Sequence, residues 1–153
     1  EHRRLSDLEW TGGAEAANQF SDGYPVLVAS TASFDLLNDK LRAAGREAVG
    51  AERFRPNIVL SGIEAHDEDR LDVMRIATAD GEARLRAVKP CARCPIPNVD
   101  PATGEVDPIV TDTLQGYRRG DRGVTFAMNA IVVEGDGLTL RVGQAVSADW
   151  KFD

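Results

Sequence analysis

Short apolar runs separated by turn residues dominate this chain and predict a fold built mainly from β-strands. Residues 25–29 and 58–60 are continuous apolar runs of the kind that form buried strands. Residues 71–88 alternate apolar and polar side chains on both sides of Asp80-Gly81, a dipeptide typical of a hairpin turn. Further strands are expected at residues 126–134, at 138–142 after an Asp136-Gly137 turn, and from Val146 onward.

Two segments have helical spacing instead. Three leucines predict one apolar helix face between a Thr31 or Ser33 cap and a helix end near Ala44, where Gly45 follows as a stop signal. A second helix of one or two turns is predicted to end at Tyr117. Many short strands joined by hairpins, with few helices, favour a small β-barrel over a doubly wound sheet.

Composition and charge narrow the expected partners. With 153 residues, 42% of them hydrophobic, the chain can bury a core as one domain without disulfides. Its net charge of −7 and pI of about 4.9 disfavour nucleic-acid binding. The chain has no apolar run of membrane-spanning length and no signal segment, so we expect no membrane partner and a cytoplasmic location. Basic residues between Arg84 and Arg93 favour a small-anion site, whereas Arg118–Arg122 and the acidic segment Glu64–Arg70 are expected to be solvated surface.

The two cysteines, Cys91 and Cys94, lie in a Pro- and Asp-rich loop expected over residues 89–108. They are too close in sequence for a disulfide that would hold a domain together. Nearby Lys89 and Arg93 favour the thiolate form. A structural zinc site or an iron–sulfur cluster needs about four ligands, and a thioredoxin-like pair would open a helix. One thiolate bound to an exogenous metal cofactor, or two inert thiols, are the alternatives left open.

Two further segments could contact a ligand. In Phe54-Arg55-Pro56-Asn57, the proline favours an extended backbone at Arg55 and presents an arginine beside an amide. That pair suits phosphate or carbonyl oxygens, although a local carboxylate such as Glu52 or Asp67 could equally satisfy the arginine. In residues 20–25, Gly23 permits close approach of backbone to a ligand, or simply an ordinary turn into a strand.

The order of these motifs resembles the MOSC domain, the molybdenum cofactor sulfurase C-terminal domain family. The motifs are Phe20-Ser21-Asp22-Gly23-Tyr24-Pro25, the helix around Ser33 to Asn38, Phe54-Arg55-Pro56-Asn57-Ile58-Val59, Cys91-Ala92-Arg93-Cys94, Val99-Asp100-Pro101-Ala102-Thr103-Gly104 and Val142-Gly143-Gln144-Ala145-Val146. The resemblance is strongest to the branch containing the mitochondrial amidoxime-reducing component and its bacterial relatives. It assigns residues 20–153 to the MOSC domain. Residues 1–19 are then an N-terminal segment, expected to be the remnant of a longer region because the chain opens with Glu1 rather than Met.

This resemblance implies a β-barrel with peripheral helices that binds a molybdenum cofactor (molybdopterin). The second cysteine of the motif, Cys94, is implied to be the metal ligand at the catalytic centre. Arg55 and Asn57 match residues that contact the pterin part of the cofactor. Gly23 and Tyr24 match the loop that also lines it, and their contacts are expected to come from the backbone. Cys91 is expected to have no direct role as a ligand.

The implied activity is the reduction of a small-molecule, N-hydroxylated substrate at molybdenum. Electrons are expected from a separate electron-donor protein or an iron–sulfur domain. The alternative is a sulfur-carrier or cofactor-binding module of the sulfurase type, without reductase activity. In such proteins, a domain dependent on pyridoxal phosphate precedes the MOSC domain.

Overall fold

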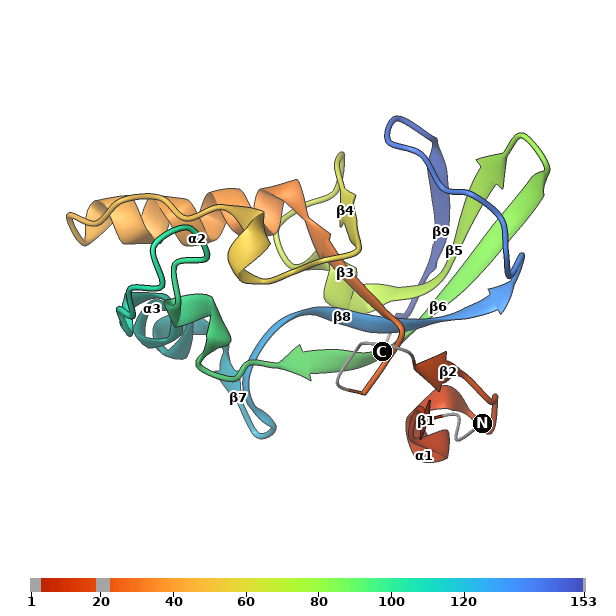
Figure 1. Ribbon diagram of the computed structural model, residues 1–153, viewed down its shortest axis with the longest axis horizontal. Coiled ribbons are helices and arrows are strands. Elements are labelled where there is room, and N and C mark those ends of the chain that lie inside the picture. Colours follow the sequence, from red (N-terminus) through yellow and green to blue (C-terminus); the bar gives the residue numbers. More distant parts are fainter. Residues whose placement is uncertain (1–3, 19–22, 153) are drawn as a thin grey trace.

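A computed structural model describes residues 4–18 and 23–152 and shows a seven-stranded, strongly curled sheet (Figure 1). The strands follow the order β4-β3-β8-β6-β5-β9, and β7 pairs with β8. Their bounds are β3 Val26–Ser30, β4 Ile58–Leu60, β5 Leu71–Thr78, β6 Gly81–Ala92, β7 Arg119–Gly120, β8 Gly123–Glu134 and β9 Val146–Trp150. The predicted mainly β fold, a β-barrel with peripheral helices, is confirmed in the form of a curled half-barrel sheet with few helices.

The curl comes from the two long central strands. β6 and β8 each have 12 residues, and their antiparallel register shifts at three places along the pair. Such bulges bend a strand and increase its twist, so a sheet built on them curls strongly. The predicted Asp80-Gly81 hairpin is confirmed, because Thr78 of β5 pairs with Gly81 of β6.

Two helices cover one end of the molecule, opposite the end formed by β5, β6 and β9 (Figure 1). They are α2, Thr31–Ala43, and α3, Ile109–Arg118. The core beneath them contains Phe34, Phe54 and Phe126, whose ring centres lie 4.5–5.5 Å apart. A second core fills the curl of the sheet and is formed by aliphatic and methionine side chains of β3, β4, β5, β6 and β8.

The helix boundaries follow the sequence signals with small shifts. The cap of α2 is Ser30, one residue before the predicted Thr31, and its hydroxyl accepts a hydrogen bond from the Ser33 N–H. Gly45 has φ of +71° and donates to the Arg42 carbonyl, so the predicted stop is confirmed. The second helix is longer than predicted and begins after Pro108, where an Asp107 carboxylate oxygen accepts from the Ile109 N–H.

One predicted strand is wrong. Residues 138–142 form a loop, and Val142 is fully exposed. Glycines 135, 137 and 143 all have positive φ, which directs the chain away from the sheet after β8. The alternation of apolar residues there had no neighbouring strand with which to pair, whereas the predicted strand from Val146 is confirmed as β9.

Residues 4–18 pack beside the sheet (Figure 1). They comprise β1 Arg4–Leu5 paired with β2 Ala17–Asn18, and the short helix α1, Leu8–Thr11. The ring of Trp10 contacts two cations, with Lys89 Nζ 4.8 Å and the Arg122 guanidinium carbon 4.5 Å from its centre. Three short 3-10 turns complete the fold: η1 Ala51–Arg53, η2 Asp67–Arg70 and η3 Ile96–Asn98.

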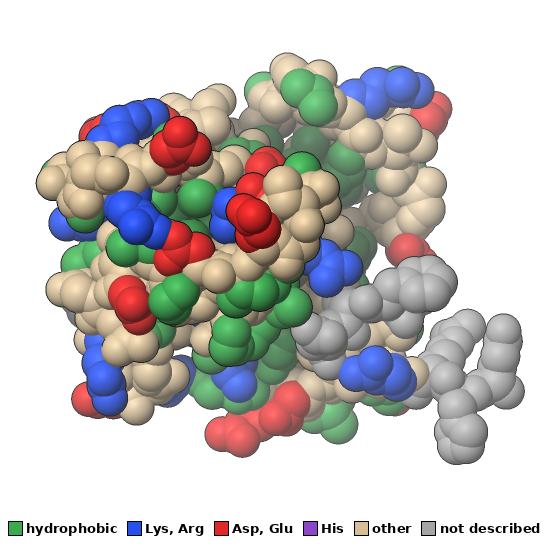
Figure 2. Space-filling model, turned by 60° about the vertical axis from the view of Figure 1, so that its left-hand side comes forward, with side chains coloured by type: hydrophobic (Ala, Val, Ile, Leu, Met, Phe, Trp, Pro, Cys, Tyr) green, Lys and Arg blue, Asp and Glu red, His purple; other side chains and the backbone are tan. Residues whose placement is uncertain are grey.

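Surface charge of both signs is interspersed on the face shown in Figure 2, around hydrophobic side chains near its middle. None of the helices within residues 4–18 and 23–152 has the length and apolar character needed to cross a membrane.

Candidate functional site

The cysteine motif occupies the carboxyl end of β6. Cys91 is half-buried within the strand, so the strand extends further than predicted, and the expected loop from Lys89 begins only after Ala92. The pairing with β8 continues one residue beyond β6, because the Arg93 N–H donates to the Val124 carbonyl at 2.9 Å. Cys94 follows immediately and is an exposed free thiol. The strand thus supplies a rigid support that ends at an accessible sulfur.

Arg93 joins the cysteine motif to the Phe54-Arg55-Pro56-Asn57 motif. Its Nη1 donates to Cys91 Sγ at 3.1 Å, and its guanidinium carbon lies 5.2 Å from the ring centre of Phe54. Its Nε is buried and has no hydrogen-bond partner within the part of the chain that the structure describes. The sequence indicated Arg93 only as a neighbouring charge, because nothing in the spacing of the two motifs shows that they meet.

Arg55 adopts a left-handed backbone conformation, with φ of +57°, so the predicted extended conformation is wrong. Its N–H donates to the carbonyls of Ala51 and Glu52 and so ends the η1 turn, as residues in this conformation commonly do. That capping outweighs the preference set by the following proline. A non-glycine residue pays about 1 kcal/mol for this conformation, and such strain is concentrated at functional sites.

The Arg55 side chain is exposed and forms no ion pair with any described residue. Of the two carboxylates suggested as partners from the sequence, Asp67 instead pairs with Arg70. The guanidinium therefore remains available to a ligand.

Asn57 fastens the start of β4 to β3. Its backbone N–H donates to the Leu27 carbonyl at 2.9 Å, and its side-chain Oδ1 accepts from the Leu27 N–H at 2.8 Å. The amide nitrogen of the same side chain makes no hydrogen bond to a described residue, so it can still donate to a ligand.

Gly23 and Tyr24 face the N-terminal segment. The Gly23 carbonyl accepts from Asn18 Nδ2 at 2.7 Å, and burial beside Asp7 and Glu9 raises the pKa of the Tyr24 phenol. Residues 20–22 of the same predicted motif lie outside the described residues. The available contacts therefore connect Gly23 and Tyr24 to the first 18 residues rather than to the cysteine motif.

Strand register places these motifs relative to one another. Leu27 of β3 lies opposite Asn129 of β8, and Asn129 in turn lies opposite Lys89 of β6. Asn57, bonded to Leu27, is thus level with Lys89, shortly before Cys91. Both β3 and β6 are antiparallel to β8, so Gly23 and Cys94 lie toward opposite ends of these strands. A ligand that contacts all the predicted residues must therefore be elongated along the strand direction.

A second group of polar residues is buried under the start of α2, where sequence analysis predicted only a solvated acidic loop. Glu68 is fully buried and accepts hydrogen bonds from the hydroxyls of Ser30 at 2.9 Å and Ser33 at 2.6 Å. We call Ser30, Ser33 and Glu68 the serine–glutamate cluster. The positive end of α2 and two hydroxyl donors stabilise this carboxylate, which corrects the predicted solvated segment.

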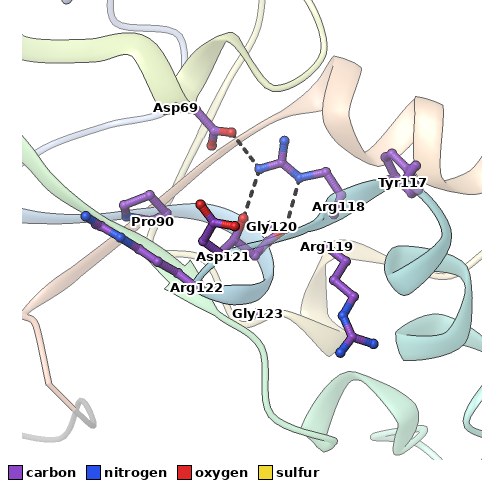
Figure 3. A pocket seen from close by; sticks show the side chains of 10 residues that line it. Asp69, Pro90, Tyr117, Arg118, Arg119, Gly120, Asp121, Arg122 and Gly123 are labelled. Carbon is purple, nitrogen blue, oxygen red and sulfur yellow. Dashed lines mark hydrogen bonds and ion pairs between the residues drawn. The ribbon is translucent and has the colours of Figure 1, made fainter.

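Next to this cluster, Arg118 forms a partly buried ion pair with Asp69 at 2.5 Å and donates through Nε to the Thr125 carbonyl at 3.0 Å. The prediction of solvated surface is therefore wrong for Arg118. Burial raises the pKa of Asp69, and the Arg118 contact opposes that rise. Burial also raises the pKa of Tyr117 to about 12. These residues lie at one side of a pocket of about 430 Å³ between α3, the β7–β8 hairpin and β6 (Figure 3).

Protein side chains alone do not form a metal site within the described residues, since no three His, Cys, Asp or Glu residues are grouped to hold an ion. An exposed thiol, a guanidinium without an ion pair and an amide nitrogen without a hydrogen bond fit a different kind of group. They suit a cofactor that brings its metal with ligands of its own and needs only one more from the protein.

The described part of the chain is a small domain built on a curled, mainly β sheet, with an exposed cysteine just beyond the end of a central strand. The MOSC domain family model matches residues 15–147, and the chain belongs to that family. The chain is 39% identical over 105 residues to mitochondrial amidoxime-reducing component 1 of Homo sapiens, covering 67% of this chain and 28% of that protein. It is 39% identical over 108 residues to mitochondrial amidoxime reducing component 2 of Rattus norvegicus, covering 69% of this chain and 29% of that protein. The chain thus spans less than a third of the length of these relatives.

Proposed function

We propose that this chain is the cofactor-binding domain of a molybdenum-dependent oxidoreductase that reduces N-hydroxylated compounds. The observation that carries the proposal is the exposed Cys94 thiol at the end of β6, in a MOSC domain similar to proteins named amidoxime-reducing components. The names of those relatives suggest the substrate class.

Each of the predicted site residues has a proposed task. Cys94, as the thiolate, is the single protein ligand to molybdenum and places the metal at the open end of the strand. The Arg55 guanidinium and the Asn57 amide donate to the pterin part of the molybdopterin, while the backbone near Gly23 and Tyr24 lines the far end. When bound, the cofactor supplies two-electron reduction at the metal.

The protein scaffold determines where the sulfur lies. Arg93 holds Cys91 against the Phe54 motif, and β8 holds the Arg93 backbone, so Cys94 leaves the sheet in a defined position. Positioning of this kind is the main contribution that a protein makes to a cofactor reaction. Electrons come from a separate donor protein or an iron–sulfur domain. Residues 1–19 are proposed to belong to an N-terminal region distinct from the MOSC domain.

Molybdenum content measured by mass spectrometry tests the proposal directly. Protein purified from a host that makes the cofactor should contain molybdenum, and Cys94→Ser should lose almost all of it while the circular dichroism spectrum is unchanged. Cys91→Ser is the matched control, because it removes the neighbouring sulfur and should retain most of the metal. Equal loss in both variants, or no metal in the wild type of the full-length protein, would overturn the assignment.

An exposed thiol also suits a sulfur carrier of the sulfurase type, and the same preparation separates the two functions. Intact-protein mass spectrometry would detect a persulfide on Cys94. A persulfide without reduction of an N-hydroxylated compound would favour the carrier.

A further inference from the structure

The pocket beside α3 has an unusual charge for this acidic protein. Three arginines line it, Arg118, Arg119 and Arg122, together with Asp69 and Asp121. Arg118 is committed to Asp69, whereas Arg119 and Arg122 form no ion pair within the described part of the chain (Figure 3). Three arginines against two aspartates leave one net positive charge in a chain of net charge −7. This local excess favours a singly charged anion.

Two residues that line the pocket each have a buried polar atom without a partner in the described structure. Asp69 Oδ1 and Tyr117 Oη are both buried without a hydrogen bond in the described structure, and both residues line the pocket. Leaving such an atom unsatisfied costs about 1–3 kcal/mol. Both atoms lie below the solvent-accessible surface, so a ligand in the pocket would contact the arginines rather than these two atoms.

The pocket adjoins the strand end that presents Cys94. Pro90 of β6 and Gly123 of β8 both line it. Arg93 is bonded to Val124, the residue after Gly123, so Cys94 leaves the sheet beside this part of the hairpin. Arg122 is held against one face of Trp10, which leaves the edge of its guanidinium free to donate hydrogen bonds.

We propose that this pocket binds a carboxylate group on the substrate, and that the enzyme therefore prefers N-hydroxylated compounds carrying a carboxylate. The inference rests on the proposed function and deepens it. Arg122, nearer to Lys89 and the cysteine strand, is the main contact, and Arg119 supports it from the other side of the hairpin. Figure 3 shows Arg122 extending past Asp121 toward Pro90 and Arg119 extending away from them, so Arg122 is placed for direct contact and Arg119 adds positive charge at longer range. A guanidinium matches a carboxylate with two parallel hydrogen bonds.

The reaction to be measured is the conversion of an amidoxime to an amidine. The N–O bond breaks, the substrate takes up two electrons from a chemical reductant such as a reduced viologen and two protons from solvent, and the oxygen leaves as water. The probes are benzamidoxime and its 4-carboxy derivative, which differ only in the charged group. The enzyme is the molybdenum-loaded, full-length protein.

Arg122→Ala is expected to raise KM for the carboxylated probe about tenfold and to leave KM and kcat for benzamidoxime unchanged. Arg119→Ala should have a smaller effect in the same direction. Arg141→Ala is the matched control, because it removes an exposed arginine outside the pocket. Raising the ionic strength should weaken the preference of the wild type. Equal effects of Arg122→Ala on both probes, or no effect on either, would overturn the proposal.

A binding experiment separates this proposal from the proposed function. Benzoate is titrated by calorimetry into the same full-length protein and into its Arg122→Ala variant. Weaker binding by the variant supports the pocket even if neither amidoxime is reduced, a result that would count against the reductase alone. Reduction of benzamidoxime together with identical benzoate affinity in both proteins would overturn the pocket and leave the reductase intact.

Discussion

The serine–glutamate cluster and the cysteine end of β6 are both polar, yet they differ in how their hydrogen bonds are satisfied. Both Glu68 carboxylate oxygens are bonded to hydroxyls inside the protein, and the side chain is fully buried. Cys94 and Arg55 are exposed and make no side-chain hydrogen bond to a described residue. Polar groups satisfied internally stabilise the fold, whereas exposed groups on a constrained backbone remain available to a ligand. Substitutions in the first region should therefore change stability, and substitutions in the second should change binding.

The largest loss of stability is expected from the cluster. Glu68→Ala leaves the hydroxyls of Ser30 and Ser33 without their shared acceptor and opens a cavity under α2, so it should lower the free energy of unfolding by about 3 kcal/mol. Urea denaturation measures the change. Glu105→Ala removes an exposed carboxylate and should stay within about 0.5 kcal/mol of the wild type. Similar losses in both variants would contradict a special role for the cluster.

Arg93 lies between the two categories, because its side chain is partly buried but acts on the cysteine motif. Arg93→Ala removes the donor to Cys91 and the contact with Phe54, and it should cost about 1–2 kcal/mol in urea denaturation. Molybdenum retention should fall as well, because the strand end that carries Cys94 is less firmly held. Arg93→Lys keeps a cation near Phe54 and should recover part of both losses. A stability loss with full metal retention would make Arg93 purely structural.

The pH dependence of stability tests the buried side of the comparison. Burial, then Arg118, lowers the pKa of His66 to about 4, with Lys40 acting in the same direction and Glu68 against it. The histidine of the unfolded chain therefore binds a proton at higher pH than that of the folded chain. The stability linked to neutral His66 is fully present above about pH 6.5 and is lost as the pH falls toward 4.

Protonation of His66 should lower the free energy of unfolding by roughly 1 kcal/mol between pH 6.5 and pH 4, after allowance for the partial exposure of the side chain. Asp69, whose pKa is raised, works in the opposite direction near the acid end of this window. Thermal denaturation from pH 7 to 4.5 measures the loss, and His66→Phe, which keeps a ring against Tyr117 and Phe126, should reduce it. An unchanged slope in that variant would exclude His66 as the cause.

The sequence predicted the strands of the apolar core better than the buried polar contacts. Apolar runs and turn dipeptides predicted β3, β4 and the β5–β6 hairpin, because those signals depend on neighbouring residues. The serine–glutamate cluster joins residues 35 and 38 positions apart, so no local pattern could show it. The contact of the Arg93 guanidinium with the Phe54 ring likewise joins residues far apart in the sequence, so no local pattern could show it. At Arg55 a local signal was present but misleading, because the end of the η1 turn outweighed the effect of Pro56.

The smallest expected effect is also the one that separates stability from binding most sharply. Arg55→Gly relieves the left-handed conformation at an exposed position, so it should raise the free energy of unfolding by about 0.5–1 kcal/mol. The same change removes the guanidinium proposed to hold the cofactor, so molybdenum retention should fall. Arg55→Ala is the matched control, because it removes the guanidinium and keeps the strain. An Arg55→Gly protein that is both more stable and poorer in metal would show that the strain at Arg55 is maintained for binding. An Arg55→Gly protein with full metal content would assign this arginine no part in holding the cofactor.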